Sequence, residues 1–376
     1  MLLPVAAIGL WGLYALVILR YLLAWHRLRP FRASERVPAT RVSVVIAARD
    51  EAATIGRCLG AVLAQDLPRD RYEVIVVDDH STDGTAGIVA GYAAAGVRLL
   101  RLAEADAGGR GGKKAALTAG IAAATGELVV TTDADCRMGP AWLRTVAAFQ
   151  QQEGADFIAA PVRFEGGGGP LGAFQRLDFL ALQGITAAAV GDGYHGMCNG
   201  ANLAFRKAVF DAVGGYRGID GIASGDDMLL MQKVARRPDA RIRYCLSADA
   251  IVETPPAAGL RAFLQQRIRW ASKARHYEER RMFCVLLLVW LANLSLPLLA
   301  MAGLLLDPQL LHTAGWLLLG KTAVEMAFLW PVAGFFGMRR SLAGFALAQP
   351  FHILYTLAAG LLGQAGTYAW KGRRVR

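Results

Sequence analysis

Four long apolar blocks constrain this 376-residue chain more than any other feature of its sequence. The first block runs from Leu2 to Ala24, and the other three cover about residues 282–306, 313–336 and 342–366. A helix needs about 20 apolar residues to cross the roughly 30 Å of a bilayer's hydrocarbon core, so each block is long enough to span a membrane. A content of 55% hydrophobic and 19% charged residues is also too apolar for an ordinary soluble enzyme. We therefore expect a membrane protein.

The first block predicts a transmembrane anchor over residues 1–26. A cleaved signal peptide is the alternative, but no positively charged residue precedes the block and no small-residue cleavage signal follows it. Several arginines follow the block, and basic loops stay on the cytoplasmic side of a membrane. The N-terminus is therefore expected outside, and the next domain in the cytoplasm, of a multi-pass protein of the cell (inner) membrane. These arginines are Arg27, Arg29, Arg32, Arg36 and Arg41.

The C-terminal membrane domain, residues 273–376, is expected to hold two or three hydrophobic spans. Three spans here would leave the basic tail outside, whereas the positive-inside rule wants both this tail and the Arg339–Arg340 pair inside. Pro350 and His352 are compatible with a broken helix in the last block. We therefore favour three full spans in the whole chain, with a re-entrant or interfacial last segment. Four full spans are the alternative.

Residues 40–272 have the pattern of a soluble α/β domain. Short β-branched runs at Val42–Ile46, Val74–Val77 and Leu128–Thr131 are separated by Ala-rich, helix-favouring stretches. This alternation predicts βαβ units and a mostly parallel sheet, whose ligands bind at the carboxyl ends of the strands. The Gly166–Pro170 run breaks the pattern and is expected to be a turn, or a linker between two halves of the domain.

Charge and cysteine content narrow the choice of partners. A net charge of +11 is compatible with nucleic acid or with a membrane protein. Because many arginines lie beside the apolar blocks, we expect a membrane and no nucleic acid. The five cysteines have no CxxC spacing and are expected to be reduced packing residues rather than a zinc site. They are Cys58, Cys136, Cys198, Cys245 and Cys284.

Acidic residues follow two of the predicted strands directly. Asp78 and Asp79 come at the end of one strand, and Asp133 and Asp135 follow another. Such residues are also common in ordinary turns. Two carboxylates spaced i, i+2 can, however, share Mg²⁺ or Mn²⁺, and a cation there would neutralise a diphosphate. Because the strand-then-acid arrangement occurs twice in one sheet, we favour a site at this edge.

A glycine-rich basic loop, Gly108 to Lys114, lies between these two acidic clusters. It is not a Walker A motif, because Ala107 stands where that motif requires Gly and Lys114 where it requires Ser or Thr. The loop is either a solvated surface loop or a cationic segment that holds a pyrophosphate by charge.

Two later segments each allow two interpretations. Asp226 and Asp227 precede a helix-like stretch, so they are either a helix cap or a site where a carboxylate accepts the proton of an attacking hydroxyl. Gln266 to Trp270, taken alone, predicts an interfacial helix with snorkelling arginines. In the third apolar block, Lys321 and Glu325 are spaced i, i+4 and either neutralise each other or line the path of a lipid acceptor.

Taken together, these motifs resemble those of the membrane-bound family 2 glycosyltransferases. The resemblance covers about Val42 to Trp270 and rests on the order of four motifs, which are very specific together and weak singly. Its motifs are Asp78-Asp79, Asp133-x-Asp135, Gly-Asp226-Asp227 and Gln266-x-x-Arg269-Trp270. Supporting stretches are Val42 to Glu51, Gln65 to Pro68, Gly112-Lys113 with Ala116-Leu117, Gly200 to Arg206 and Gly214 to Tyr216.

The resemblance implies a GT-A nucleotide-diphospho-sugar transferase fold beside transmembrane helices, and a role for each motif. Asp78 and Asp79 would contact the base and ribose of the nucleotide. Asp133 would hold the ribose and, with Asp135, an Mg²⁺ or Mn²⁺ ion, while Lys113 would lie near the phosphates.

The same resemblance implies that Asp227 is the base that deprotonates the acceptor hydroxyl. Asp226, Gln266, Arg269 and Trp270 would line the acceptor and diphosphate site.

The implied activity is an inverting transfer of a sugar, from a nucleotide-diphospho-sugar that is expected to be a UDP-sugar, to a hydroxyl acceptor. We favour a membrane lipid or lipid-linked glycan as the acceptor. The alternatives are a processive polysaccharide synthase, a catalytically silent membrane assembly partner and a transporter. The Gly-Asp-Asp cluster, His80 and Thr118 depart from the patterns common among polymerising synthases, which counts against the first alternative.

Overall fold

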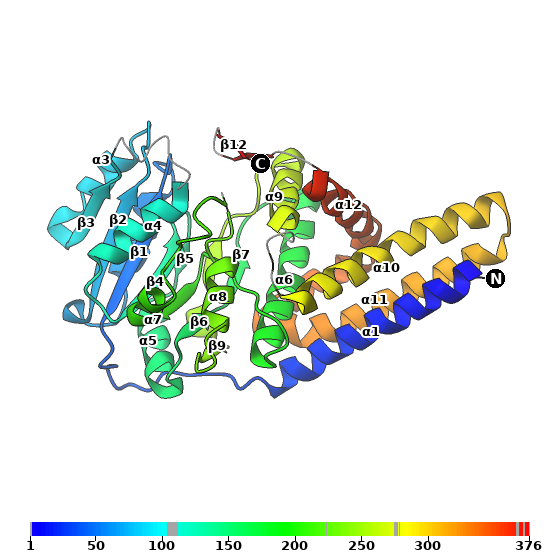
Figure 1. The fold of residues 1–376 in the computed structure, drawn as a ribbon, viewed down its shortest axis with the longest axis horizontal. Helices are drawn as coiled ribbons and strands as arrows, with labels where there is room; N and C mark the ends of the chain where they lie inside the picture. Colours follow the sequence, from blue (N-terminus) through cyan, green and yellow to red (C-terminus); the bar gives the residue numbers. More distant parts are fainter. Residues whose placement is uncertain are drawn as a thin grey trace. The chain divides into compact units, whose positions relative to one another are not determined.

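The structure is a computed structural model that describes residues 2–103, 112–222, 224–273, 277, 279–365, 368–370 and 373–375. The chain forms two compact units. The sheet unit comprises Leu28–Glu165 and Gly196–Pro255, and the membrane-helix unit comprises Met1–Arg27, Gly166–His195 and Pro256–Arg376. Figure 1 shows the helices and strands of each unit.

The sheet unit is built on a seven-stranded sheet in the order β3-β2-β1-β4-β8-β6-β9. Its parallel part consists of β1 (Val42–Ala48), β2 (Tyr72–Asp78), β3 (Val97–Arg101) and β4 (Leu128–Asp133). Strand β8 (Leu203–Arg206) runs antiparallel to β4 and to β6 (Phe157–Ala159), and β9 (Ile242–Tyr244) is parallel to β6. The predicted mostly parallel sheet is confirmed, and each predicted strand is longer than its apolar run.

Helices and a small second sheet complete this unit. The helices are α2 (Ile55–Leu63), α3 (Thr85–Ala90), α4 (Gly112–Ala123), α5 (Trp142–Glu153), α7 (Lys207–Ala212) and α8 (Met228–Ala235). The second sheet has the order β5-β10-β7 and consists of β5 (Arg137–Met138), β10 (Val252–Thr254) and β7 (Val162–Phe164). Short 3₁₀ turns are η1 (Arg69–Arg71), η2 (Ala93–Ala95) and η4 (Ala248–Ala250).

Close packing of helices on the parallel strands fixes the core of the sheet unit. All residues of β1 except Ala47 are buried, as expected for a strand that is covered on both faces. Helix α4 approaches β1 so closely that a Cβ atom on Gly120 would lie 2.5 Å from Val45 Cγ1 and 3.0 Å from Val77 Cγ2. The glycine is therefore required by the helix–sheet contact, and this contact holds the start of α4 near the strand ends.

The membrane-helix unit contains α1 (Leu2–Arg27), α6 (Gly169–Gly191), α9 (Leu260–Ser272), α10 (Arg280–Leu305), α11 (Gln309–Phe335) and α12 (Phe345–Ala365). A 3₁₀ segment, η6 (Arg339–Gly344), precedes α12, and a hairpin of β11 (Tyr368–Trp370) and β12 (Arg373–Val375) follows it. Among the described residues, four helices are long and apolar enough to cross a membrane: Leu3–Arg27, Arg280–Leu305, Gln309–Phe335 and Arg339–Gln364.

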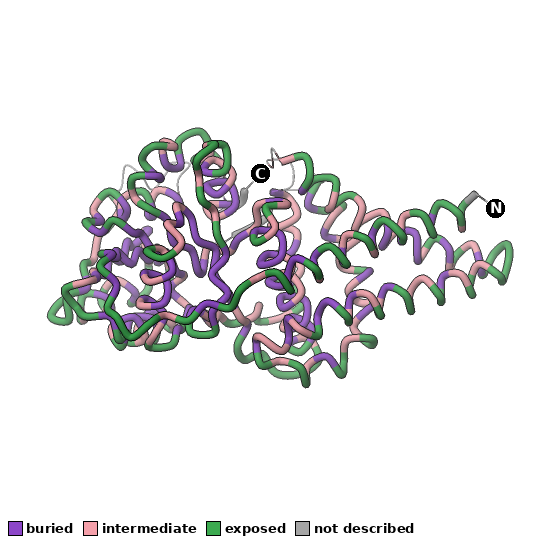
Figure 2. The backbone as a smooth tube through the Cα atoms, turned by 90° about the horizontal axis from the view of Figure 1, so that it is seen from below, coloured by how far each residue is buried: buried purple, intermediate pink, exposed green. Residues whose placement is uncertain are grey.

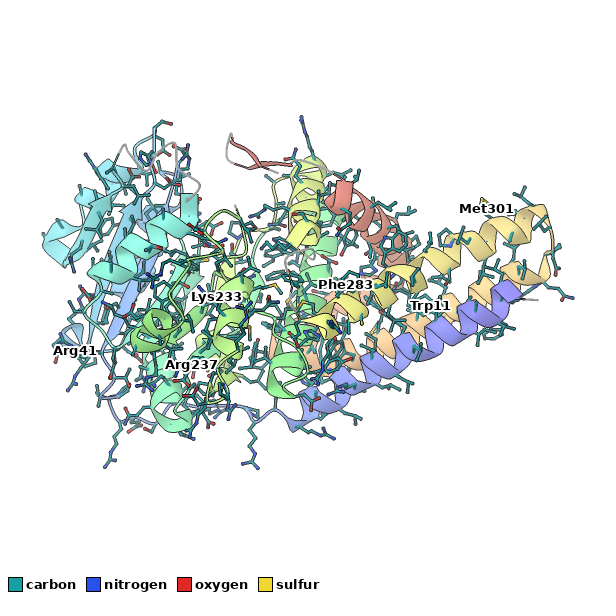
Figure 3. The ribbon with its side chains drawn as sticks, in the orientation of Figure 1. Trp11, Arg41, Lys233, Arg237, Phe283 and Met301 are labelled. Carbon is teal, nitrogen blue, oxygen red and sulfur yellow. The ribbon has the colours of Figure 1, made fainter. Side chains whose placement is uncertain are left out.

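These four helices keep many large apolar side chains on their outer faces. Leu305, Trp316 and Leu347 are 74, 74 and 87% exposed, and Figure 2 shows that exposed positions recur along the helices. Phe283 and Met301, labelled in Figure 3, are exposed side chains of α10. Soluble proteins rarely expose apolar surface of this extent, so contact with lipid is indicated.

The last apolar block forms one continuous helix, α12, with Pro350 inside it. The expected break near Pro350 and His352 is therefore wrong. Proline is tolerated within membrane helices when neighbouring groups satisfy the freed backbone carbonyl. Pro297 in α10 and Pro331 in α11 also lie inside helices. How many of the four helices cross a bilayer stays a prediction.

Polar contacts between α1, α10, α11 and α12 are buried inside the helix bundle. Lys321 Nζ lies 2.5 Å from Glu325 Oε1 and 2.7 Å from Gln349 Oε1, while Gln349 Nε2 donates to Glu325 Oε2 at 2.6 Å. The Tyr14 hydroxyl also donates to Glu325. These four side chains satisfy one another, which favours mutual neutralisation as the role of the charged pair. Trp11 Nε1 donates to Ser295 Oγ at 3.0 Å in the same bundle (Figure 3).

The compact units do not follow the predicted domains 1–26, 40–272 and 273–376. Helices α6 and α9 group with the membrane helices, because their apolar side chains pack there. The Phe174 ring of α6 lies 5.7 Å from that of Phe263 on α9 and 4.6 Å from that of Phe351 on α12. The Gly166–Pro170 run, predicted as a turn or linker, begins where the chain passes from the sheet unit to the membrane-helix unit, and its last two residues already belong to α6.

Candidate active site

The carboxyl ends of β2, β1 and β4 bring the first two acidic clusters to one edge of the sheet. In the strand register, Ala48 of β1 pairs with Asp78 and Ala47 pairs with Asp133. The chain adds β2 and β3 on one side of β1 and then returns to place β4 on the other side. Such a reversal of strand order is a topological switch point, where ligands bind in open α/β sheets. The structure therefore places the two acidic clusters at one edge of the sheet, and ligand binding at this edge stays a prediction.

Asp78 and Asp79 are both almost fully buried, with 6 and 4% of their surface exposed. The amide of Asp79 donates to Ala48 O at 2.8 Å, and its carboxylate lies 3.1 Å from His80 Nδ1 and 3.7 Å from Arg49 Nη1. Asp78 Oδ1 has no hydrogen-bond partner within the described part of the chain. A buried, unpaired carboxylate oxygen is costly, so this atom is available to a hydroxyl or N–H donor of a ligand.

Lys113 connects the second acidic cluster with the third. Its Nζ lies 2.6 Å from Asp133 Oδ1 and 3.2 Å from Asp226 Oδ2. Burial alone would lower the pKa of Lys113, but attraction to Asp133, Asp226 and Asp227 raises it well above its ordinary value. Lys113 is therefore a permanent cation between two carboxylates that are 93 positions apart in the sequence (226 minus 133).

Negative charge concentrates around Asp135. Burial, with repulsion from Asp133 and Glu51, raises the pKa of Asp135 to about 6. Its Oδ1 accepts weak hydrogen bonds from Thr254 Oγ1 at 3.4 Å and Cys136 Sγ at 3.6 Å. Within the described ranges, no group of three or more His, Cys, Asp or Glu side chains is arranged to hold a metal ion. The protein here offers two carboxylates, Asp133 and Asp135, and no complete cage.

Asp227 caps helix α8, as one of its two interpretations predicted. Its Oδ1 accepts from the amide of Met228 at 2.7 Å, and its Oδ2 accepts from the amide of Gly200 at 3.1 Å. A Cβ atom on Gly200 would lie 3.2 Å from Asp226 Oδ2 and 3.3 Å from Lys113 Nζ, so this backbone closes tightly over the acidic pair. A carboxylate oxygen carries two lone pairs, so accepting one hydrogen bond in a helix cap does not by itself prevent it from accepting a proton.

The structure thus brings seven of the ten predicted site residues together in the sheet unit. These are Asp78, Asp79, Lys113, Asp133, Asp135, Asp226 and Asp227. Gln266, Arg269 and Trp270 lie on α9 in the membrane-helix unit. Residues 108–111 of the predicted cationic loop lie outside the described residues.

The α9 motif contains an arginine that sequence reasoning assigned to the headgroup region. Arg267 is buried instead, and its Nε and Nη2 donate to Asp178 Oδ2 of α6 at 2.9 and 2.6 Å. Tyr355 of α12 donates to the other Asp178 oxygen. The expectation of snorkelling is therefore wrong for Arg267, because a partner on α6 offsets the cost of burying its charge. The available sequence signal was Asp178 itself, an acidic residue within a largely apolar stretch of α6.

A second missed residue is Lys114, which is 3% exposed. Its Nζ donates to three backbone carbonyls in the segment that leads to Asp226, those of Ile219, Ile222 and Ser224. Its neighbour Lys113 instead contacts carboxylates. Two adjacent lysines at the start of α4 therefore hold different parts of the same site.

Comparison with known proteins gives consistent results. The model of "Glycosyl transferase family 2" matches residues 43–214. Glycosyltransferase AglE of Haloferax volcanii is 30% identical over 228 residues, which cover 61% of this chain and 71% of that protein. Beta-monoglucosyldiacylglycerol synthase of Synechocystis sp. is 27% identical over 278 residues, which cover 69% of this chain and 53% of that protein. The chain thus spans about half the length of this second relative.

A solved structure supports the fold. Mannosyltransferase PcManGT from Pyrobaculum calidifontis, in complex with GDP-Man and Mn²⁺, superposes with a TM-score of 0.59 at 24% identity. The superposition covers 96% of this chain and 97% of that one. The sheet unit therefore has a GT-A-like fold, accompanied by candidate membrane helices.

Proposed function

Because this chain belongs to glycosyl transferase family 2, we propose that it transfers a sugar from a nucleotide-diphospho-sugar to a hydroxyl group of a membrane lipid or lipid-linked glycan. The observation that carries the proposal is the contact of Lys113 with both Asp133 and Asp226. This contact links Asp133, which lies at the end of a strand and is assigned to the sugar donor, with Asp226, which lies before a helix and is assigned to the acceptor. Sugar transfer needs donor and acceptor groups in one place.

The nucleotide end of the donor is assigned to Asp78 and Asp79. The unpaired, buried Oδ1 of Asp78 suits a ribose hydroxyl or a base N–H. We favour UDP as the nucleotide on the basis of the sequence resemblance. Because the similar mannosyltransferase is in complex with GDP-Man, GDP-sugars belong in the same test.

The diphosphate end is assigned to Lys113, Asp133 and Asp135. The two carboxylates are hard oxygen donors, and burial together with repulsion from Asp133 and Glu51 raises the pKa of Asp135. Asp133 and Asp135 fit Mg²⁺ or Mn²⁺ and would hold such an ion at this end of the donor. When bound, the cation would supply neutralisation of the charge that develops on the leaving diphosphate. Lys113 contributes a fixed positive charge to the same end.

The acceptor end is assigned to Asp227. In a single displacement, the acceptor oxygen bonds to the anomeric carbon, the bond from that carbon to the diphosphate oxygen breaks, and the hydroxyl proton passes to the Asp227 carboxylate. Such a displacement inverts the anomeric configuration. The amides of Gly200 and Met228 fix the orientation of this carboxylate. Asp226 lies against Lys113, where it orients the cation rather than accepting the proton.

A lipid acceptor is favoured by the membrane-helix unit. The exposed apolar side chains of the four candidate spans support association with a bilayer. Gln266, Arg269 and Trp270 follow in the chain on α9 and are assigned to the acceptor and diphosphate. The Synechocystis relative is named as a glucosyldiacylglycerol synthase, which agrees with a lipid acceptor. A processive polysaccharide synthase and a catalytically silent assembly partner remain the alternatives.

Charge at the helix ends supports a cytoplasmic catalytic unit. Arg27 ends α1, Arg280 and Arg281 begin α10, and Arg339 and Arg340 follow α11. The turn between α10 and α11, around Asp307, contains no Lys or Arg. By the positive-inside rule, the arginine-rich ends lie in the cytoplasm, and the chain enters the sheet unit directly after Arg27.

The test uses membranes that contain the full chain, labelled UDP-sugars or GDP-sugars, and Mg²⁺ or Mn²⁺. Products are partitioned between organic and aqueous phases. Label in the organic phase that Asp227→Asn abolishes is the expected result. Label in high-mass aqueous or insoluble material would instead identify a polysaccharide synthase. Equal transfer by the wild type and Asp227→Asn would overturn the role of Asp227, and loss in Asp226→Asn alone would move the base to Asp226.

A further inference from the structure

We propose that Lys114 is a positioning residue of this site, which holds the segment before Asp226 and Asp227 in place through three backbone carbonyls. The inference rests on the proposed function for its effect on catalysis, but the contacts themselves do not depend on it. The three contacts of the Lys114 ammonium group are with backbone carbonyls, so its effect on transfer is expected through the position of that backbone.

The contacts of Lys114 use all of its hydrogen-bonding capacity. Its Nζ donates to Ile219 O at 2.7 Å, Ile222 O at 2.5 Å and Ser224 O at 3.0 Å. An ammonium group has three N–H donors and no acceptor, so three carbonyl partners satisfy it completely. A lysine that is only 3% exposed would be expensive to bury without such partners.

The segment that Lys114 contacts has little structure of its own. Described residues 213–222 and 224–227 contain turns and bends but neither helix nor strand. Gly214, Gly215, Gly218 and Gly225 all have positive φ angles there, so the backbone turns repeatedly. Its carbonyls therefore lack the regular ladder partners that a helix or strand supplies.

Lysine side chains supply those partners from two sides. Lys233 of α8, labelled in Figure 3, donates from its Nζ to Gly215 O and Arg217 O at 2.5 and 2.8 Å. Lys114 of α4 holds the part of the segment nearest to the acidic pair, since Ser224 is two residues before Asp226. Lys114, rather than Lys233, therefore holds the backbone next to the proposed catalytic carboxylates.

The consequence is that the first turn of α4 fixes the acidic pair twice. Lys113 binds the Asp226 carboxylate at 3.2 Å, and Lys114 binds the backbone two residues upstream. Because α4 is packed against β1 through Gly120, its start is rigidly placed beside Asp133. Lys114 therefore helps to keep Asp227 at a fixed distance from the end of β4, where Asp133 lies.

The test compares Lys114→Met and Lys114→Gln with a matched control, Lys207→Met, in the full-length protein in membranes. Methionine fills similar space without any donor, and glutamine keeps an NH₂ group that can still serve two carbonyls. Lys207 likewise donates from Nζ to a backbone carbonyl, that of Ala124 at 2.5 Å, at the opposite end of α4 from Lys113 and Lys114. Readouts are kcat, the KM for the nucleotide sugar, unfolding temperature and amide hydrogen exchange over residues 216–227.

For Lys114→Met, we expect kcat to fall by about 10- to 100-fold, the range that follows a displacement on the order of 1 Å, while the KM for the donor changes by less than about twofold. Exchange should rise in residues 219–227, Lys114→Gln should recover part of both effects, and the control should show neither. The proposal is overturned if Lys114→Met keeps kcat within about twofold of wild type. It is equally overturned if kcat falls only in step with a lower unfolding temperature, without locally increased exchange.

Failure of the proposed function gives a different pattern. If the wild type transfers no sugar, the exchange measurement still decides whether Lys114 holds the segment. Increased exchange confined to residues 219–227 in Lys114→Met would support the positioning role, and unchanged exchange there would overturn it.

Discussion

The buried pair of Arg267 and Asp178 gives a prediction with a large expected effect on stability. Their side chains are 4 and 3% exposed, and two N–H groups of Arg267 converge on one Asp178 oxygen. Arg267→Met keeps an unbranched, mostly apolar stem but removes the guanidinium group, which leaves Asp178 with Tyr355 as its remaining donor partner among those described above. Breaking a buried pair in this way costs about 3–5 kcal/mol, because a charge is left without compensation.

The double variant separates charge burial from packing. Arg267→Met with Asp178→Leu removes both charges and retains similar volume, so its main loss is the acceptor of the Tyr355 hydroxyl, worth about 1–3 kcal/mol. It should therefore be more stable than either single variant, whereas simple addition of two single losses gives about 6–10 kcal/mol.

Equilibrium unfolding in mixed detergent micelles, followed by far-ultraviolet circular dichroism, measures these differences. Single variants that each lose less than about 1 kcal/mol, as exposed pairs do, would refute the reasoning. Additive losses in the double variant would refute it as well. Transfer activity should fall with the single variants, because α9 carries Gln266, Arg269 and Trp270.

Three further outcomes are expected. Gly120→Ala should lower the free energy of unfolding by about 1–3 kcal/mol, since the new methyl group would meet Val45 at 2.5 Å; unchanged thermal unfolding would show that α4 can move away. Burial, with the charge of Arg20, lowers the pKa of His195 to about 4 from 6.5. Between these two pH values the unfolded chain therefore binds a proton at His195 that the folded chain does not bind. The free energy of unfolding should then fall as pH drops from 6.5 to 4, by up to about 1.4 kcal/mol per pH unit, and His195→Asn should flatten this slope in thermal melts; parallel slopes would contradict it. Asp78→Ala should weaken UDP or GDP binding by about tenfold in calorimetry, the equivalent of one charge-assisted hydrogen bond, and undiminished affinity would remove Asp78 from the nucleotide site.

Most of the sheet could be predicted because its signal is local. The runs at Val42–Ile46, Val74–Val77 and Leu128–Thr131 are β-branched and continuous, as strands buried on both faces must be. The acids that follow them could also be placed, since parallel strands end at one edge. Local sequence thus predicted both the parallel strands and the position of the acidic residues at their carboxyl ends.

The errors arose where burial depends on distant parts of the chain. Helix α6 looked like part of a soluble domain, because the sequence does not show that Phe174 packs against Phe263 and Phe351. Arg267 looked exposed for the same reason, since its partner Asp178 lies 89 positions away. Lys114 belonged to a loop that could be either solvated or a pyrophosphate-binding segment, and its three carbonyl partners are more than 100 positions further along the chain.

The hydrogen bond between Trp11 and Ser295 has a consequence for the order of events during synthesis. The two residues are 284 positions apart, and a ribosome that adds roughly 5–20 residues per second needs on the order of tens of seconds to cover that distance. During this interval the helices that pair with Trp11 and Tyr14 have not yet been made. Tyr14 waits even longer, because Glu325 is 311 positions away. Arg20 and Tyr21 gain their partners Asp192 and His195 earlier, so it is the first half of α1 that stays without its polar partners until α10 and α11 are made.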